Sequence, residues 1–257
     1  MAQATGRETL VEPSARNLAR FFTGFPRRVM RWDDVWAGDS ESPEPIINSA
    51  ALLRPLDDTS APELTHRLAH YYSAARGGPW MLWSAWPTPD LAPFGFTLIG
   101  RPPLMTRPAG TPPIPQPNGL RIEEVGDAEG LAVYERTLID GYGLQETMGA
   151  VPPGQSLPPE SIPGPVRYWI GYVDGAPAAV AAGVAGDGVV GIYGVATMPD
   201  ARGKGYGGAV TDAAARCDPS LPAVLQASDM GRPVYERLGF TTIAPYTLWL
   251  RTRVANH

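Results

Sequence analysis

The sequence predicts a mixed α/β (α+β) fold in which two similar units follow each other along the chain. One observation is an apolar segment that ends at Pro199 and passes through a glycine-rich loop into an Ala-rich helix. A second is that landmarks of the first half recur 144 residues later, so that Gly95-Phe96 matches Gly239-Phe240. A third is a proline-rich stretch between the halves, typical of a semi-rigid linker.

The composition is that of a globular protein. The chain has 257 residues, 44% hydrophobic and 18% charged, and can bury a sizeable core. Its net charge of -5 gives no general attraction to nucleic acid or to anionic membranes. Cys217 is the single cysteine, so no intrachain disulfide is expected. With no apolar signal-like or membrane-spanning run, we expect a cytoplasmic protein without membrane or nucleic-acid partners.

The prolines divide the chain. Seven of them fall between Pro102 and Pro117. The expected organisation is a first domain at 1–107, a proline-rich linker at 108–118 and a second domain at 119–257.

The offset of 144 residues aligns the secondary structure expected for the two halves. It also pairs Pro55 with Pro199 and Arg107 with Arg251. In the first half we expect strands near 46–54, 80–86 and 96–105, and a helix near 61–76. In the second half we expect a helical region at 134–148, strands at 168–173, 193–197, 225–228 and 241–250, and a short helix at 231–238.

The loop after Pro199 has the composition of an anion cradle. Glycines have no Cβ to hold a ligand away from the backbone, and the following helix N-terminus adds partial positive charge. The residues concerned are Arg202, Gly203, Lys204, Gly205, Tyr206, Gly207 and Gly208. A Walker-type loop is excluded because no hydroxyl residue follows Lys204. A dinucleotide fingerprint needs an acidic residue about twenty positions later, at the end of a second parallel strand. It is disfavoured because the next strand candidate ends only near 227–229, which is too late in the sequence.

The spacing Arg-x-x-Gly-x-Gly, at Arg202, Gly205 and Gly207, resembles the acetyl-coenzyme A signature of the GNAT acetyltransferase superfamily. About thirty residues later, the segment 234–240 reads Val-Tyr-Glu-Arg-Leu-Gly-Phe and is similar to the family's Phe-Tyr-x-x-Leu-Gly-Phe ending. The resemblance covers residues from about 119 to 253. It implies the GNAT fold, with a mixed, mostly antiparallel sheet flanked by helices, and the repeat extends it to two tandem GNAT-like units.

The resemblance also implies a set of cofactor contacts. Acetyl-CoA would be the cosubstrate, with its pyrophosphate on 202–208 and its pantetheine arm in a gap between 193–197 and 225–228. Strand residues Val195, Ala196 and Thr197 would contact the cofactor, and Ser228 stands where the family often has Asn. The backbone N–H of Val195 would polarise the thioester carbonyl.

Tyr235 is the candidate general acid for the leaving thiolate. A phenol suits this role because its ordinary pKa of about 10 keeps it protonated at neutral pH. The general base is not identified, because residues 191–193, where many relatives place a Glu, contain no carboxylate. Asp140 and Glu146 are alternatives on the acceptor side, each set against an ordinary surface role.

The first half is expected to lack the cofactor site. The positions equivalent to Arg202–Gly207 are 58–63, which contain no glycine, and Asp57, Asp58 and Glu63 place negative charge there. Tyr235 corresponds to Leu91. The first half would therefore support the second and form one wall of the acceptor cleft.

The function expected is N-acetyl transfer from acetyl-CoA to an amine of a small molecule, by direct attack in a ternary complex. The alternative is a CoA-binding sensor or assembly module without turnover. The segment 151–165 is either an acceptor-binding loop or an exposed connection. No metal is expected, because His66 and His70 share a helix face with no further ligand nearby. The protein would be a monomer or a homodimer.

Overall fold

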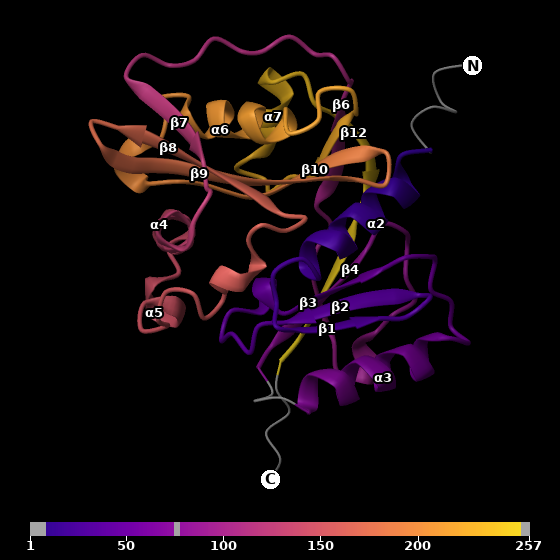
Figure 1. Ribbon diagram of the computed structural model, residues 1–257. Helices are drawn as coiled ribbons and strands as arrows, with labels where there is room; N and C mark the ends of the chain where they lie inside the picture. The colour runs from indigo at the N-terminus through magenta and orange to yellow at the C-terminus, as the bar shows by residue number, and fades with distance from the viewer. Residues whose placement is uncertain (1–8, 75–77, 253–257) are drawn as a thin grey trace, which may run out of the picture.

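The computed structural model describes residues 9–74 and 78–252, which form two sheets with helices above, between and below them (Figure 1). The first sheet has six strands. In spatial order they are β1 (Arg28–Arg31), β2 (Val35–Asp39), β3 (Ser49–Leu52), β4 (Trp80–Ser84), β13 (Thr247–Arg251) and β5 (Thr97–Gly100). Only β3 and β4 pair in parallel; the other pairs are antiparallel.

The second sheet has seven strands and contains one parallel pair, β10 with β11. In spatial order they are β12 (Thr241–Pro245), β6 (Pro103–Arg107), β11 (Ala223–Gln226), β10 (Val189–Thr197), β9 (Ala176–Gly186), β8 (Arg167–Val173) and β7 (Leu120–Glu124). The two sheets therefore share one strand order, and the second has β7 in addition.

The helices cover both faces of the second sheet and separate it from the first (Figure 1). The α-helices are α2 (Val11–Phe22), α3 (Ala61–Ser73), α4 (Ala128–Tyr142), α5 (Gln145–Met148), α6 (Tyr206–Ala215) and α7 (Arg232–Arg237). Short 3-10 turns are η1 (Pro45–Ile47), η2 (Ala92–Phe94), η3 (Pro159–Ser161) and η4 (Pro199–Ala201). Helices α6 and α7 lie on one face of the second sheet and α4 on the other, and α2 lies between the two sheets. None of the described helices is long and apolar enough to cross a membrane.

Each half of the chain gives its last strand to the other half. Strand β6 follows β5 in sequence but lies in the second sheet, between β11 and β12. Strand β13 follows β12 but lies in the first sheet, between β4 and β5. The two crossing segments meet, because the amide of Tyr246 donates to the carbonyl of Pro102 at 2.9 Å.

This exchange corrects two expectations from the sequence. The single strands expected at 96–105 and 241–250 are each two strands, and the members of each pair belong to different sheets. The first break is at 101–102, and Pro102 cannot donate a ladder hydrogen bond. The second is at Tyr246, a buried residue at the crossing point.

The offset of 144 residues holds from β3 onward in the first half and from β10 onward in the second. It carries β6 onto β13 residue for residue, and β5 onto the start of β12. Helix α3 overlaps the counterpart of α6, and β3 overlaps the counterpart of β10. The expected helix end near Arg76 lies outside the described residues. The tandem arrangement inferred from sequence is confirmed by the equivalent strand orders.

Helix α2, from the first half of the chain, anchors the second sheet. Buried Asn17 donates to the carbonyls of Val184 and Gly186 at 3.0 and 2.9 Å and accepts from the Tyr193 hydroxyl at 2.8 Å. Phe21 stacks on Tyr193 with ring centroids 4.3 Å apart. The core of the second unit is therefore completed by the first.

The residues at 108–118 run over α6 as a long connection (Figure 1). Gly110 donates to the carbonyl of Pro219 at 3.0 Å, and Arg216 donates to the carbonyl of Thr111 at 3.2 Å. The domain boundaries that we expect at 107 and 119 along the sequence remain a prediction. In space, β6 and β13 cross that division.

Candidate functional site

The glycine-rich loop presents a row of unused amides at the start of α6. Gly203 and Gly205 have φ of 78° and 83°, in the left-handed region that favours glycine. No backbone N–H from Gly203 to Gly208 donates a hydrogen bond to any described residue. Six successive free donors beside a helix N-terminus, with exposed Lys204 among them, form a site suited to an anion.

The loop lies close to the end of β10 at Gly207. A Cβ on Gly207 would lie 2.7 Å from the Oγ1 of Thr197. A side chain at position 207 would therefore require the Thr197 hydroxyl or the start of α6 to move.

The guanidinium of Arg202 binds protein carbonyls. Its Nη2 donates to the carbonyl of Gly141 at 2.8 Å, and its Nε donates to that of Thr197 at 3.3 Å. Gly141 in turn packs against β10, because a Cβ there would lie 2.8 Å from the Cβ of Ala196. Arg202 thus joins the loop, the end of β10 and the end of α4.

Strands β10 and β11 separate just where the site begins. They pair in parallel only at Val190–Ala223 and Gly191–Val224, and beyond Gly191 no pairing joins them. This confirms the gap expected in the sheet. On its other side, β10 pairs with β9 but shifts register between Tyr193 and Ala196.

Tyr235 lies on α7. Its ring makes an edge contact with Phe240, at 6.0 Å between centroids, and a Cβ on Gly231 would lie 2.9 Å from the Tyr235 ring. Burial, with a smaller contribution from the phenol of Tyr142, raises the pKa of Tyr235 well above its ordinary value of 10. Tyr235 therefore keeps its proton at any physiological pH, as a proton donor must. Tyr142 itself is 45% exposed at the end of α4.

Ser228 is placed in the connection after β11, and the strand predicted to include it ends at Gln226. Its Oγ accepts from the amide of Gly231 at 3.1 Å, and its carbonyl accepts from Arg232 at 2.9 Å. Ser228 is exposed and positions the start of α7, the helix that carries Tyr235.

The proline-rich segment 151–165 is held by residues from both halves of the chain. Buried Glu135 on α4 accepts hydrogen bonds from the amides of Gly154, Ser156 and Leu157, which anchors the proline-rich segment 151–165. Ser40 donates to the carbonyl of Ser156 at 3.3 Å. Residues of the first half therefore contact the segment next to the site.

Neither Asp140 nor Glu146, the two alternative bases, bonds to another described residue through its carboxylate. Asp140 is half-buried on α4 and Glu146 is exposed on α5, and neither carboxylate hydrogen-bonds to a described residue. In the stretch 191–193, which contains no carboxylate, the hydroxyl of Tyr193 is turned to Asn17. The general base is not identified by the structure.

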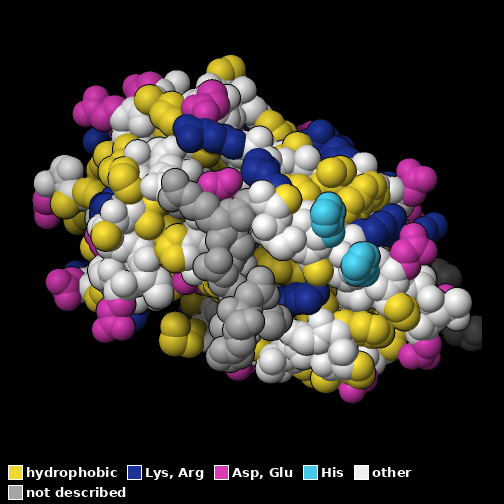
Figure 2. All heavy atoms as spheres, turned by 90° about the horizontal axis from the view of Figure 1, so that it is seen from below, with side chains coloured by type: hydrophobic (Ala, Val, Ile, Leu, Met, Phe, Trp, Pro, Cys, Tyr) yellow, Lys and Arg dark blue, Asp and Glu magenta, His cyan; other side chains and the backbone are white. Residues whose placement is uncertain are grey.

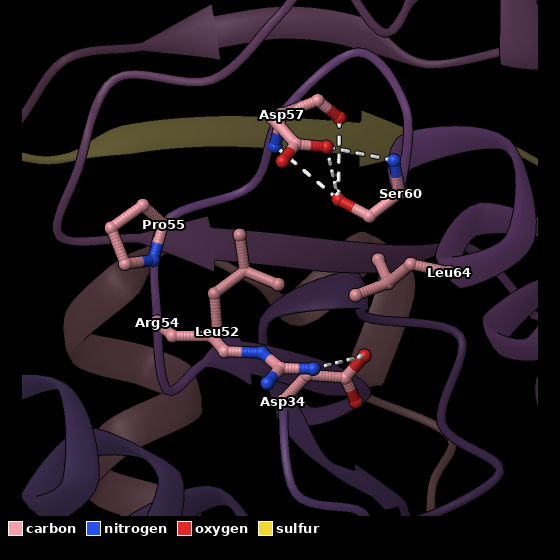
Figure 3. A pocket seen from close by; sticks show the side chains of 7 residues that line it. All are labelled: Asp34, Leu52, Arg54, Pro55, Asp57, Ser60 and Leu64. Carbon is pink, nitrogen blue, oxygen red and sulfur yellow. Dashed lines mark hydrogen bonds and ion pairs between the residues drawn. The ribbon is translucent and has the colours of Figure 1, made fainter.

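In the equivalent loop of the first half, a carboxylate from the loop accepts hydrogen bonds from the loop's own residues. The carboxylate of Asp57 accepts from the amides of Thr59 and Ser60 at 3.0 and 2.8 Å and from the Ser60 hydroxyl at 2.7 Å (Figure 3). Beside it lies a pocket of about 300 Å³, lined by Asp34, Leu52, Arg54, Pro55, Asp57, Ser60 and Leu64. Leu91, which replaces Tyr235, is fully buried. The amides of Thr59 and Ser60, which correspond to those of Gly203 and Lys204, are thus occupied by the carboxylate of Asp57.

The two described histidines and Cys217 are surface or partly buried residues. The two described histidines lie exposed on α3 and face solvent (Figure 2). Within the described part of the chain, no group of three or more metal-ligating side chains occurs. Burial raises the pKa of Cys217 to about 11, which leaves its thiol unreactive.

Sequence reasoning missed three polar residues that hold the elements around the loop and β10 in place. Tyr134 on α4 bonds the carbonyl of Gly194 in β10, Glu135 anchors the segment 151–165, and Asn17 fixes β9 and β10. All three are polar groups of buried helix faces. Only a polar residue within an otherwise apolar helix pattern signals them in sequence.

Comparison with known proteins agrees with this geometry. Residues 164–242 match the family model of the acetyltransferase (GNAT) domain. A GCN5-related N-acetyltransferase from Kribbella flavida is 22% identical, with a TM-score of 0.66 over 95% of this chain and 96% of that one. A putative GNAT acetyltransferase from Novosphingobium aromaticivorans is 17% identical, with a TM-score of 0.56 over 95% and 97%. No curated protein matches the chain.

A tandem GNAT protein from the clavulanic acid biosynthesis pathway is 13% identical, with a TM-score of 0.51 over 100% of this chain and 97% of that one. The fold is therefore that of solved GNAT proteins, including a tandem one. The chain contains a GNAT acetyltransferase domain in its second half, and its fold as a whole is a tandem of two GNAT-like units.

Proposed function

We propose that the protein is an acetyl-CoA-dependent N-acetyltransferase that transfers an acetyl group to an amine of a small molecule. The observation that carries the proposal is the row of six free amides at 203–208, directly beside the gap between β10 and β11. In the first half, by contrast, the Asp57 carboxylate accepts from the amides of Thr59 and Ser60, the counterparts of Gly203 and Lys204.

The cofactor would lie across the start of α6 and along the open edge of β10. Its pyrophosphate would accept from the amides of 203–208, with Lys204 adding charge. Arg202 would act mainly by holding the loop, since its guanidinium donates to two carbonyls. The pantetheine arm would follow Val195, Ala196 and Thr197, with Ser228 across the gap.

The chemistry proposed is a single acyl transfer. The acceptor nitrogen forms a bond to the thioester carbonyl carbon while the Val195 N–H donates to the carbonyl oxygen. The carbon–sulfur bond then breaks, and Tyr235 gives its proton to the departing sulfur. The amine proton leaves through water, since no carboxylate stands at 191–193.

The acceptor would enter on the α4 side, beside a wall formed by α5, the segment 151–165 and residues 40–48 of the first half. Hydrogen bonds from Ser40 to Ser156, from Ser42 to Met148 and from Thr147 to Glu44 support a wall shared by both halves. A monomer or homodimer in the cytoplasm, without nucleic-acid, membrane or metal requirements, remains our prediction.

The alternative is a CoA sensor that binds without turnover, and the absent strand carboxylate is the observation that favours it. The two are separated by measuring thiol release from acetyl-CoA with a panel of small amines. Turnover supports the transferase. CoA binding without thiol release for any amine would support the sensor.

Substitution of Tyr235 tests the mechanism. We expect Tyr235→Phe to lower kcat at least about 100-fold with little change in CoA affinity, because only the proton donor is lost. Tyr172→Phe on β8, away from the gap, is the matched control and should keep full activity. Because the pKa of Tyr235 is raised above 10, kcat of the native enzyme should not fall between pH 8 and about 10 through loss of this proton. A Tyr235→Phe enzyme with native kcat would contradict the assignment.

A further inference from the structure

Strand β10 contains a bulge at the centre of the site. Tyr193 faces Ala182 of β9, but Ala196 faces Val180, so β10 has one extra residue in this interval. Gly194 has a φ of 54°, in the left-handed region. The bulge therefore sets the direction of the peptide unit that joins Gly194 to Val195.

The carbonyl of that peptide unit is bonded from α4. The hydroxyl of Tyr134 donates to the carbonyl oxygen of Gly194 at 3.1 Å. Tyr134 is only 1% exposed, and its ring packs against Tyr168 with centroids 4.7 Å apart. A buried phenol held on both sides has little freedom, so the bond has a defined direction.

Gly194 is fitted to this contact. A Cβ at this position would lie 2.5 Å from the Tyr134 hydroxyl. Both the positive φ and the close approach of the phenol therefore require glycine here.

The consequence falls on the amide of Val195. The carbonyl of Gly194 and the N–H of Val195 belong to one planar peptide unit and point in opposite directions. Fixing the carbonyl toward α4 therefore turns the N–H away from α4. Donation to the carbonyl also polarises the peptide unit and strengthens its N–H as a donor.

Among the described strands, no register pair includes either residue of this unit. Gly194 and Val195 have no Cα partner in the β9 register, and β11 has already left β10 at Gly191. We propose that Tyr134 is a positioning residue that locks the Gly194–Val195 peptide unit, so that the Val195 N–H is held ready for the thioester carbonyl. This inference rests on the proposed acetyl transfer for its catalytic consequence.

The test is Tyr134→Phe, with Tyr168→Phe as the matched control. The control removes a neighbouring buried hydroxyl that makes no hydrogen bond to β10. We expect Tyr134→Phe to lower kcat about tenfold, with CoA affinity and the amine KM within about twofold of native, because a misdirected oxyanion donor weakens only the transition state. Tyr168→Phe should stay within about twofold in all three. A native kcat in folded Tyr134→Phe would overturn the proposal.

A second variant approaches the same contact from the other side. Gly194→Ala places a methyl carbon 2.5 Å from the Tyr134 hydroxyl and so displaces it from the carbonyl. We expect the same selective loss of kcat, although Tyr134 is still present. A loss of CoA affinity instead of kcat in both variants would overturn the proposal by showing a general effect on the strand.

Hydrogen exchange separates this inference from the proposed function. We expect the Val195 amide to be protected on addition of acetyl-CoA to the native protein, and less protected in Tyr134→Phe. If no amine supports turnover, the transferase proposal fails while this measurement still judges the role of Tyr134. Equal protection of Val195 in the native protein and Tyr134→Phe would overturn that role.

Discussion

Gly207 shows how one missing methyl group sets the geometry of the cofactor loop. A Cβ there would lie 2.7 Å from the Oγ1 of Thr197, although the φ of Gly207 lies outside the left-handed region. An alanine would therefore be acceptable to the helix backbone, but its methyl group would displace the Thr197 hydroxyl or the start of α6, next to the cofactor loop.

We expect Gly207→Ala to weaken CoA binding about tenfold, which corresponds to about 1.4 kcal/mol. Stability should change little or rise slightly, because alanine is the better helix former. Calorimetric titration with CoA and thermal unfolding measure the two effects. The control is Gly126→Ala, where a Cβ meets nothing within 4 Å. Native CoA affinity in Gly207→Ala would show that the close approach is unnecessary.

At this scale, the sequence predicted what is local and missed what depends on folding. The free amides at 203–208 follow from glycines and cations that adjoin in sequence, and the pattern around Tyr235 extends over a few residues. The bond from Tyr134 to Gly194 joins residues 60 apart. Nothing near Tyr134 in sequence distinguishes its hydroxyl from that of any other tyrosine on a buried helix face.

At the scale of elements, the exchanged strand β6 is fastened to α6 by a buried ion pair. The Nη1 of Arg107 donates to Oδ1 of Asp212 at 2.8 Å, and the two side chains are 3% and 7% exposed. Arg107 also lies over the ring of Phe240, at 5.2 Å from its centroid. The repeat preserves only the second contact, since Arg251 lies over Phe96 at 5.5 Å.

We expect Arg107→Ala to lower the free energy of unfolding by about 3 kcal/mol, because it leaves Asp212 buried with one partner fewer. The loss stays at this level because Arg216 still contacts the Asp212 carboxylate at 3.1 Å. Arg251→Ala is the matched control from the other half. It makes no ion pair with a described residue and should cost less than about 1 kcal/mol. Urea unfolding of both variants measures the difference, and equal losses would contradict the role of the ion pair.

The order of the elements was predictable, but their membership in sheets was not. The offset of 144 residues aligned the strands of the two halves, because repeated sequence makes repeated structure. The segments 96–105 and 241–250 each have the apolar character of one continuous strand. Which sheet the end of such a segment joins depends on how the halves pack, and that information is absent from local periodicity.

At the scale of the whole molecule, the two units are interlocked. Each sheet contains a strand from the other half, and α2 packs between them. A separated second unit would lose β6 from between β11 and β12, together with Asn17 and Phe21 beneath β10. Its own β13 would have no sheet to join. Residues 119–257 alone should therefore be poorly soluble.

Cleavage of the linker tests the interlocking without deleting any element. A protease site inserted at 108–118 would allow the folded chain to be cut between β6 and β7. The two pieces should elute together in native size-exclusion chromatography, because β6 and β13 each remain paired on both edges in the opposite piece. They should separate only in denaturant, and acetyl-CoA binding should survive the cut, because the amides at 203–208 and the strands around them stay in place. Pieces that part under native conditions would show that the exchanged strands do not hold the halves together.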